Sequence, residues 1–371
     1  MRLLALPFLL ALCACASADP TPPTVVFKAK ETDTFPSIRI PALLCTNKGT
    51  LLAVAEGRNK PHDQAENDYI LRRSTDNGRT WSKSQVILEQ GDVCLNNPCL
   101  VQDAKSSRIF LFFQTFPPGN GQFSKGVKTG PDGPNKIGYI TSDDDGRTWS
   151  KPIDVSHLKP DNATTTASGP GIGIQLTRGP KAGRLVIPFN SKDGGSYFTN
   201  WVAYSDDAGK TWKRGADVPQ DKIQPNEVQV SETADGGLYL NSRQWKGTGG
   251  RKVAWSTDGG ETWTPIAEDK SLPEPVCQGS LLSFTDNGRH ITLFLSPEGE
   301  PAGKGRTNGV LRLSLDGGKT WKHSRLLVPG KFAYSSMARL KDGRIAIIYE
   351  PNSNTEILFL TVDLAWLEKG K

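Results

Sequence analysis

An eight-residue pattern, Ser-x-Asp-x-Gly-x-Thr-Trp, occurs five times in this chain of 371 residues and constrains its fold more than any other feature. The starts of successive copies lie 51 to 68 residues apart. A recurrence of this kind is typical of proteins in which one structural unit is repeated radially or in a stack. The copies begin at Ser74, Ser142, Ser205, Ser256 and Ser314.

The residue types in the pattern predict a hairpin turn. An Asp side chain accepts hydrogen bonds from backbone N–H groups a few residues further on, and Gly provides a backbone with positive φ. Thr and Trp favour the strand that follows. We therefore interpret the five aspartates as turn formers rather than catalysts: Asp76, Asp144, Asp207, Asp258 and Asp316.

The segments between the copies predict short β-strands. Short apolar runs such as Leu51–Ala55, Ile109–Phe113 and Ile345–Tyr349 lie between segments that contain Gly, Pro, Asn or Asp. A period near 58 residues divides the chain into six units, of which one has lost the pattern. The predicted fold is all-β, a six-bladed β-propeller of four-stranded antiparallel blades. We expect Glu356–Asp363 to complete a blade that begins near the N-terminus.

The N-terminal residues predict a secretory signal. A basic Met1-Arg2 precedes the apolar run Leu3–Leu12, and Ala16–Ala18 fits a small-x-small cleavage site. The prediction is a signal peptide at 1–18 and one propeller domain at 19–371, secreted, periplasmic or at the cell surface. A lipid anchor at Cys15 is the alternative. The apolar run is too short for a stable membrane span.

Four cysteines follow the predicted cleavage site: Cys45, Cys94, Cys99 and Cys277. An exported chain can oxidise its thiols, and Cys94 and Cys99 are close enough in sequence to form a disulfide. The sequence does not fix this pairing, and buried free thiols are the alternative. We expect no metal and no cofactor, because this spacing with four histidines does not suit zinc. The net charge of +6, without a basic tract, argues against nucleic acid and suits a small anionic ligand.

An Arg-Ile-Pro motif at Arg39–Pro41 lies at the start of the first predicted strand. Together with the five repeated patterns, it resembles the exo-α-sialidases (neuraminidases) of the bacterial and animal type. The resemblance covers nearly the whole chain after residue 18. It implies a metal-independent propeller that removes terminal sialic acid from sialylated glycans with retention of configuration, and we expect a monomer.

The resemblance implies that three arginines grip the carboxylate of the substrate: Arg39, Arg243 and Arg306. Guanidinium groups offer fixed forks of donors that match a carboxylate. Arg312 competes with Arg306, but it lies inside the strand that leads to the last copy. Glu350, at the end of an apolar strand, resembles the glutamate that holds Arg39 in place.

The same resemblance implies the catalytic groups. Asp63 resembles the acid/base aspartate, with Asp68 as a rival in the same loop. Tyr334 resembles the nucleophile and Glu227 the glutamate that draws its proton, as in sialidases generally. The anomeric carbon of sialic acid bears a carboxylate, so a carboxylate nucleophile would approach against like charge, whereas a tyrosine attacks as a nearly neutral oxygen.

Weaker matches complete the predicted site. Arg58 resembles an arginine that contacts the sugar near its ring hydroxyls, and Asn97 a polar residue near the amide side of the substrate. Ser168–Gln175 resembles a loop at the rim of the site. The Gly-rich insertion Gln114–Lys136, with Phe116 and Phe123, shapes the aglycone side or is variable surface.

Taken together, the sequence predicts a secreted exo-α-sialidase that hydrolyses terminal α-linked sialic acids through a covalent tyrosyl-enzyme intermediate. Intramolecular transfer to an anhydro product is a variant of the same chemistry. A non-catalytic sialoglycan-binding propeller would keep the arginines and dispense with Tyr334, Glu227 and Asp63. A purely structural propeller would have no use for three separated arginines and Glu350.

Overall fold

The computed structural model is almost entirely β in the residues it describes. The predicted signal peptide and Cys15 lie outside the described residues, as does Phe123. The described part contains strands β1 to β26, one 3-10 helix, η1 (Ser156–Leu158), and one short helix, α1 (Leu364–Glu368), which follows β26. Among these described residues, no helix is long and apolar enough to cross a membrane. The structure describes residues 19–31, 34–122, 124–195, 197–220, 224–245, 249–300, 302–351 and 354–370.

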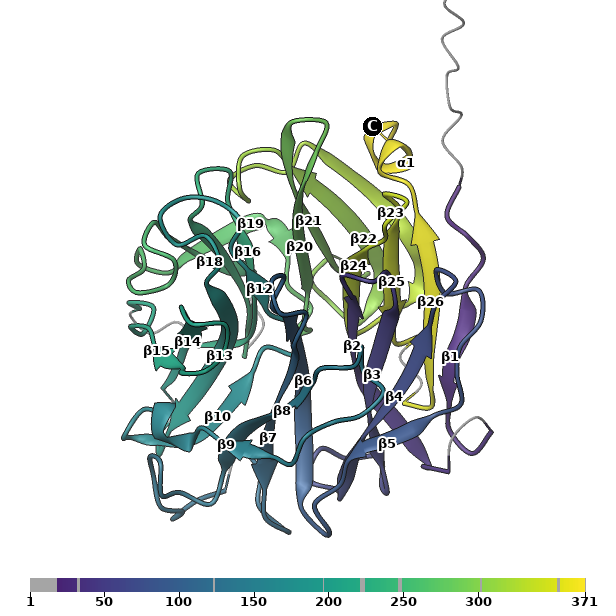
Figure 1. Cartoon of the computed structure of the whole chain (residues 1–371). Coiled ribbons are helices and arrows are strands. Elements are labelled where there is room, and N and C mark those ends of the chain that lie inside the picture. Colours follow the sequence, from purple (N-terminus) through teal and green to yellow (C-terminus); the bar gives the residue numbers. More distant parts are fainter. Residues whose placement is uncertain are drawn as a thin grey trace, which may run out of the picture.

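The strands follow one another in antiparallel four-stranded units that succeed each other around the molecule (Figure 1). The first unit contains β2 (Ser37–Cys45), β3 (Leu51–Arg58), β4 (Asn67–Ser74) and β5 (Gln85–Leu88). The second contains β6 (Cys94–Gln102), β7 (Ile109–Phe116), β8 (Lys136–Ser142) and β9 (Ile153–Asp154). The third contains β10 (Ala163–Ser168), β13 (Leu185–Asp193), β14 (Phe198–Ser205) and β15 (Lys213–Arg214), near the short strands β11 (Gly171–Ile172) and β12 (Ile174–Gln175).

The remaining strands repeat the same order. The fourth unit contains β16 (Pro225–Glu232), β17 (Leu238–Gln244), β18 (Gly250–Ser256) and β19 (Ala267–Pro273). The fifth contains β20 (Ser280–Asp286), β21 (Arg289–Pro297), β22 (Thr307–Ser314) and β23 (His323–Lys331). The sixth contains β24 (Ser335–Arg339), β25 (Ile345–Tyr349), β26 (Glu356–Val362) and β1 (Thr24–Lys28).

Hydrogen bonding joins these six units into five sheets among the described residues. A parallel bridge between Asn67 of β4 and Cys94 of β6 links the first and second units into one nine-stranded sheet. The β-propeller class is confirmed. In the described part of the chain, the six units form five hydrogen-bonded sheets rather than six, because this one bridge joins two neighbouring units.

The two ends of the chain share one sheet, which confirms the predicted closure. β1 pairs antiparallel with β26, and the two strands lie side by side in Figure 1. In the other five units the repeated pattern connects the third strand to the fourth. In the sixth unit these strands come from opposite ends of the chain. The pattern was therefore not lost from this unit, because no turn exists there to carry it.

The repeated pattern forms the expected turn in every copy. In the first, Asp76 accepts hydrogen bonds from the Thr80 N–H at 2.9 Å and the Thr80 hydroxyl at 2.6 Å. Gly78 has a φ of 84° and donates its N–H to the Ser74 hydroxyl at 2.9 Å. The Asp-to-Thr bonds recur at Asp144, Asp207, Asp258 and Asp316.

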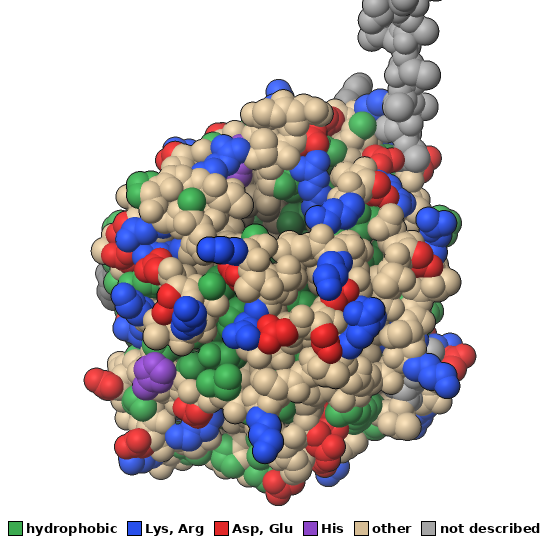
Figure 2. Space-filling model, viewed as in Figure 1, with side chains coloured by type: hydrophobic (Ala, Val, Ile, Leu, Met, Phe, Trp, Pro, Cys, Tyr) green, Lys and Arg blue, Asp and Glu red, His purple; other side chains and the backbone are tan. Residues whose placement is uncertain are grey.

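The hydrophobic core lies between neighbouring units. One cluster joins Leu52 and Val54 of the first unit to Leu100 and Leu111 of the second, all fully buried. Burying one such side chain contributes about 1.5–3 kcal/mol. On the face shown in Figure 2, Lys and Arg side chains are interspersed with Asp and Glu, as expected for a net charge of +6.

Candidate active site

A cavity of about 320 Å³ brings together eight of the nine predicted site residues. It lies at the strand ends opposite the repeated turns: Ser37, at the start of β2, pairs with Arg58, whereas Ser74, which begins a turn, pairs with Leu51 at the other end of β3. The ninth residue, Glu350, is buried and holds Arg39. The predicted residues that line the cavity are Arg39, Arg58, Asp63, Asn97, Glu227, Arg243, Arg306 and Tyr334.

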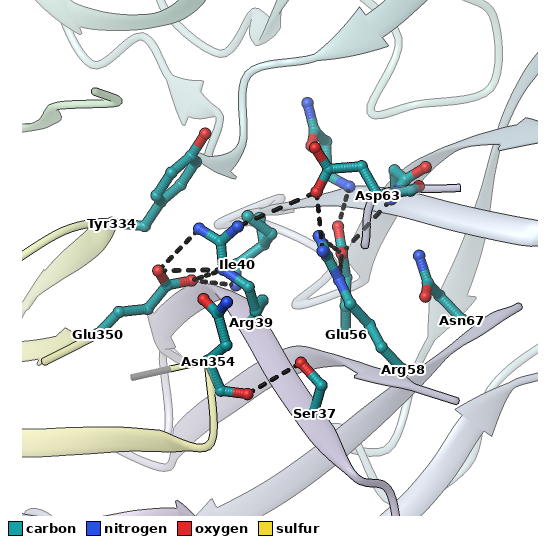
Figure 3. Close-up of polar contacts among 12 residues, drawn as sticks. Ser37, Arg39, Ile40, Glu56, Arg58, Asp63, Asn67, Tyr334, Glu350 and Asn354 are labelled. Carbon is teal, nitrogen blue, oxygen red and sulfur yellow. Dashed lines mark hydrogen bonds and ion pairs between the residues drawn. The ribbon is translucent and has the colours of Figure 1, made fainter. Parts of the chain in front are cut away.

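Arg39 is held by a carboxylate from the opposite end of the chain. Its Nε and Nη2 atoms donate to Glu350 at 3.2 and 2.9 Å (Figure 3). The N–H of Ile40 donates to the same carboxylate at 2.7 Å, and Ile40 has a φ of 56°. Glu350 is 1% exposed, and its buried carboxylate is paired with Arg39 and with the backbone N–H of Ile40.

Tyr334 and Glu227 lie in direct contact. The Tyr334 hydroxyl donates to Glu227 Oε1 at 2.5 Å, and Arg243 Nη1 lies 2.6 Å from Glu227 Oε2 and 3.0 Å from the Tyr334 oxygen. Burial raises the pKa of Tyr334 and the Glu227 carboxylate raises it further, although Arg243 and Arg306 oppose both effects. Tyr334 is therefore a neutral phenol with a base in place to take its proton.

The three predicted arginines converge on Tyr334. The guanidinium carbons of Arg39 and Arg306 lie 5.0 and 5.4 Å from the centre of its ring, and Arg243 reaches its hydroxyl. Arg306 donates to the Val276 carbonyl at 2.9 Å and, among the described residues, forms no ion pair. The rival Arg312 does not line the cavity and pairs with Glu298 at 3.5 Å.

Asp63 faces this group from an exposed loop. Its side chain is 70% exposed, accepts a hydrogen bond from Arg58 Nη1 at 2.8 Å and lies 4.0 Å from Arg39 Nη1 (Figure 3). Burial would raise the pKa of Asp63, but the guanidinium groups of Arg58, Arg39 and Arg243 lower it overall. The rival Asp68 lies in β4 outside the cavity lining, and burial raises its pKa to about 6.

Glu56 is a buried site residue that the sequence analysis missed. It is fully buried and accepts hydrogen bonds from Arg58 Nε at 2.8 Å and from the Asn97 N–H at 2.7 Å. Burial raises the pKa of Glu56, against the effect of Arg58. A signal was present, because Glu56 is a charged residue in an apolar strand and shares a strand face with Arg58 two positions on.

The two predicted loops contribute in different ways. The Asn97 amide donates to the Ser168 carbonyl at 3.2 Å, so Ser168–Gln175 is attached to the second unit. The insertion Gln114–Lys136 supplies Gln114, Phe116, Gly121 and Gln122 to the cavity wall. Sequence reasoning missed seven further lining residues, which stand singly and carry no motif: Gln64, Asn96, Thr165, Ala167, Asn190, Asn226 and Trp245.

Cys94 and Cys99 are free thiols, so the possible bridge between them is not formed. The Cys94 thiol donates to the Asp63 carbonyl at 2.9 Å, and burial raises the pKa of Cys94 to about 12. This neutral thiol helps to hold the loop that carries Asp63.

Comparisons with known proteins identify the family of this chain. A family model described as a BNR repeat-like domain matches residues 24–347. A sialidase of Micromonospora viridifaciens is 35% identical over 346 residues, which cover 90% of this chain and 52% of that protein, so the chain spans about half of its length.

Two further matches cover most of both partners. An exo-alpha-sialidase of Arthroderma benhamiae is 30% identical over 374 residues, or 91% of this chain and 85% of the relative. The solved structure of Hadza microbial sialidase Hz136 matches with a TM-score of 0.81 and 30% identity over 92% of this chain and 68% of that one. With the family model spanning most of its length, this chain belongs to the sialidase family with BNR repeats.

Proposed function

We propose that the chain is an exo-α-sialidase that hydrolyses terminal α-linked sialic acids of glycoproteins, glycolipids or oligosaccharides with retention of configuration. The observation that carries this proposal is the Tyr334 hydroxyl, bonded to Glu227 at 2.5 Å and surrounded by three guanidinium groups. An anionic sugar fits such a centre, because the arginines bind its carboxylate and leave the anomeric carbon beside the phenol oxygen.

In the first half of the proposed reaction, Tyr334 forms a bond to the anomeric carbon. Glu227 takes the phenol proton, which the raised pKa of Tyr334 requires. The glycosidic C–O bond breaks, and Asp63 gives its proton to the leaving oxygen. The carboxylate of the substrate brings a negative charge close to Asp63 and Arg39, which raises the pKa of Asp63 and favours its protonated form.

In the second half, Asp63 acts as a base. It removes a proton from water, the water oxygen bonds to the anomeric carbon from the side that the aglycone left, and the Tyr334 oxygen departs. Glu227 returns the proton to Tyr334. Two displacements at the same carbon give retention, and no metal or cofactor takes part in these steps.

We also propose that residues 19–371 act as one exported, monomeric domain. The support is the signal-like sequence of residues 1–18 and the strand β1, which closes the last sheet from the N-terminal end. The mass of the protein recovered from culture medium tests export, since cleavage after Ala18 and lipidation at Cys15 give different masses.

The test of the function is proton NMR of the reaction with α2,3- and α2,6-linked sialyl-lactose. The proposal predicts that α-sialic acid appears first and then mutarotates. An anhydro sugar as the product would assign intramolecular transfer instead. Binding without turnover would assign a non-catalytic sialoglycan-binding protein and overturn the proposal.

A further inference from the structure

The segment Glu274–Gln278, which connects β19 to β20, lies outside the cavity lining and contacts two parts of the site. The Val276 carbonyl accepts the hydrogen bond from Arg306 at 2.9 Å. Gln278 exchanges two hydrogen bonds of 3.1 Å with the backbone of Ser335, the residue after Tyr334. Apart from its contact with Arg306, nothing in the proposed reaction uses this segment.

The backbone of this segment is strained where it meets Arg306. Val276 has a φ of 56°, a left-handed conformation that a β-branched residue adopts only when surrounding contacts impose it. Such outliers cluster at functional sites. The contacts that hold Val276 in this left-handed conformation set the direction of its carbonyl, and the carbonyl in turn positions Arg306.

A buried ion pair holds the kink. Glu274 accepts the Cys277 N–H at 3.0 Å and pairs with Arg251 Nη1 at 2.6 Å. Arg251 Nη1 also donates to the Cys277 carbonyl at 2.6 Å, and its Nε donates to Asn241 at 2.7 Å. Both Glu274 and Arg251 are 1% exposed. The pair is therefore hydrogen-bonded to both the N–H and the carbonyl of Cys277, the residue that follows Val276.

A related arrangement occurs twice more around the cavity, but there the carboxylate accepts the N–H of the positive-φ residue itself. Glu350 binds Arg39 and the N–H of Ile40, at a φ of 56°. Glu56 binds Arg58 and the N–H of Asn97, at a φ of 54°. In those two cases the arginine itself lines the cavity, whereas Arg251 does not. Glu274 therefore acts on the cavity through the backbone of Val276 and Cys277.

We infer that the Arg251–Glu274 pair positions Arg306 through the Val276 carbonyl, an inference that rests on the proposed function. Arg39 and Arg243 share their charge with Glu350 and Glu227, whereas Arg306 is held by a neutral carbonyl. The pair thus fixes Arg306 in place, and within the described part of the chain no carboxylate pairs with Arg306, so its charge is available to the carboxylate of the sugar. Glu274 and Arg251 are positioning residues that touch no substrate.

The test compares the parent with Glu274→Gln, using 2-deoxy-2,3-didehydro-sialic acid and its methyl ester as calorimetric probes. We expect the Kd of the acid to rise about tenfold and the Kd of the uncharged ester to change little, because only the acid needs a placed Arg306. For a sialoside substrate, KM should rise by a similar factor with kcat nearly unchanged. A general loosening of the fold would weaken both probes alike.

Two variants guard against a folding defect. Glu274→Asp keeps the charge opposite Arg251 but shortens the side chain, and should raise the Kd of the acid about threefold. Val276→Gly adopts a positive φ without strain, so Glu274→Gln should weaken binding less in that background. Asp206→Asn is the control, because Asp206 pairs with the buried Arg184 outside the cavity lining. It should lower Tm and leave both Kd values unchanged.

The outcomes separate the two proposals. If the parent binds the acid and hydrolyses the substrate, but Glu274→Gln and Glu274→Asp keep the parental ratio of acid to ester affinity, the positioning inference is overturned and the sialidase proposal stands. If the parent neither binds the acid nor hydrolyses the substrate, both are overturned.

Discussion

The two walls of the cavity are built differently. On one wall, Arg39 and Glu350 are 12% and 1% exposed, and Tyr334, Glu227 and Arg243 are buried and hydrogen-bonded to one another. On the other wall, Asp63 is 70% exposed on a loop, tied by one hydrogen bond to Arg58. Glu227 and Arg243 lie 16 residues apart, but the other contacts of the first wall join sequence positions more than 90 residues apart, whereas Asp63 and Arg58 lie five apart.

This difference matches the tasks proposed for the two walls. Binding a carboxylate and aiming a phenol require charges that are fixed before the substrate arrives, because reorganisation at the moment of reaction slows it. An acid/base group must also exchange its proton with water between the two half-reactions, which an exposed loop permits. Substitutions on the buried wall should therefore alter both stability and catalysis, and substitutions on the exposed wall catalysis alone.

The largest effect is expected on the buried wall, at Tyr334. Tyr334→Phe removes the proposed nucleophile and should lower kcat by roughly 10³-fold or more, while the Kd of a sialic acid analogue changes little. Steady-state kinetics and calorimetry measure the two quantities. Tyr139→Phe, at a buried tyrosine outside the cavity lining, is the matched control. Equal rates for Tyr334→Phe and the parent would remove Tyr334 from the mechanism.

Glu350→Gln should affect stability and catalysis together. It leaves the largely buried Arg39 without its carboxylate, so we expect unfolding free energy to fall by about 3 kcal/mol. The KM of a sialoside should rise at the same time, since Arg39 loses its fixed position. Denaturant titration and kinetics on the same preparation measure both. If the variant has a normal KM but a lowered free energy of unfolding, Glu350 stabilises the fold without positioning Arg39 for substrate binding.

Asp63→Asn tests the exposed wall and should lower kcat for sialyl-lactose about 10²-fold with no change in Tm. In kcat/KM, which reports the first half-reaction, the loss should be much smaller for an aryl sialoside whose phenol leaves without protonation. Glu350→Gln should impair both substrates to the same extent. If Asp63→Asn impairs the two substrates equally, Asp63 does not act as the acid.

The smallest effect is a shift in pH dependence. Arg58 lowers the pKa of Asp63, so removing Arg58 raises it. The rate depends on protonated Asp63 and falls as pH rises through its pKa, so the descending limb of kcat/KM should move to higher pH. We suggest the pair Arg58→Gln with Glu56→Gln, so that no buried carboxylate is left unpaired. High salt should reduce the shift, because Asp63 is exposed; a shift to lower pH would contradict the account.

The residues of the buried wall could be predicted from the sequence, whereas the contacts that hold them in place could not. The repeated turns follow from local patterns, the closure by β26 from the expected propeller architecture, and the arginines and Tyr334 from a family resemblance. The joining of two units through Asn67 and Cys94, and the partners of Arg251, depend on strand register and on loops between units. No local propensity specifies these contacts. The position of Val276 at a positive φ contradicts its own propensity and emerges only from the packing around it.

The central claim is that the Tyr334 oxygen bonds to the sugar, and one measurement tests it most directly. A sialic acid bearing fluorine at the anomeric carbon and at its neighbour should load the enzyme quickly and turn over slowly, so that the intermediate accumulates. Mass spectrometry of the digested protein should then find one sugar attached to the peptide that contains Tyr334, and none in Tyr334→Phe. A sugar attached to Asp63 or Glu227, or no adduct on an enzyme that the reagent inactivates, would contradict the account.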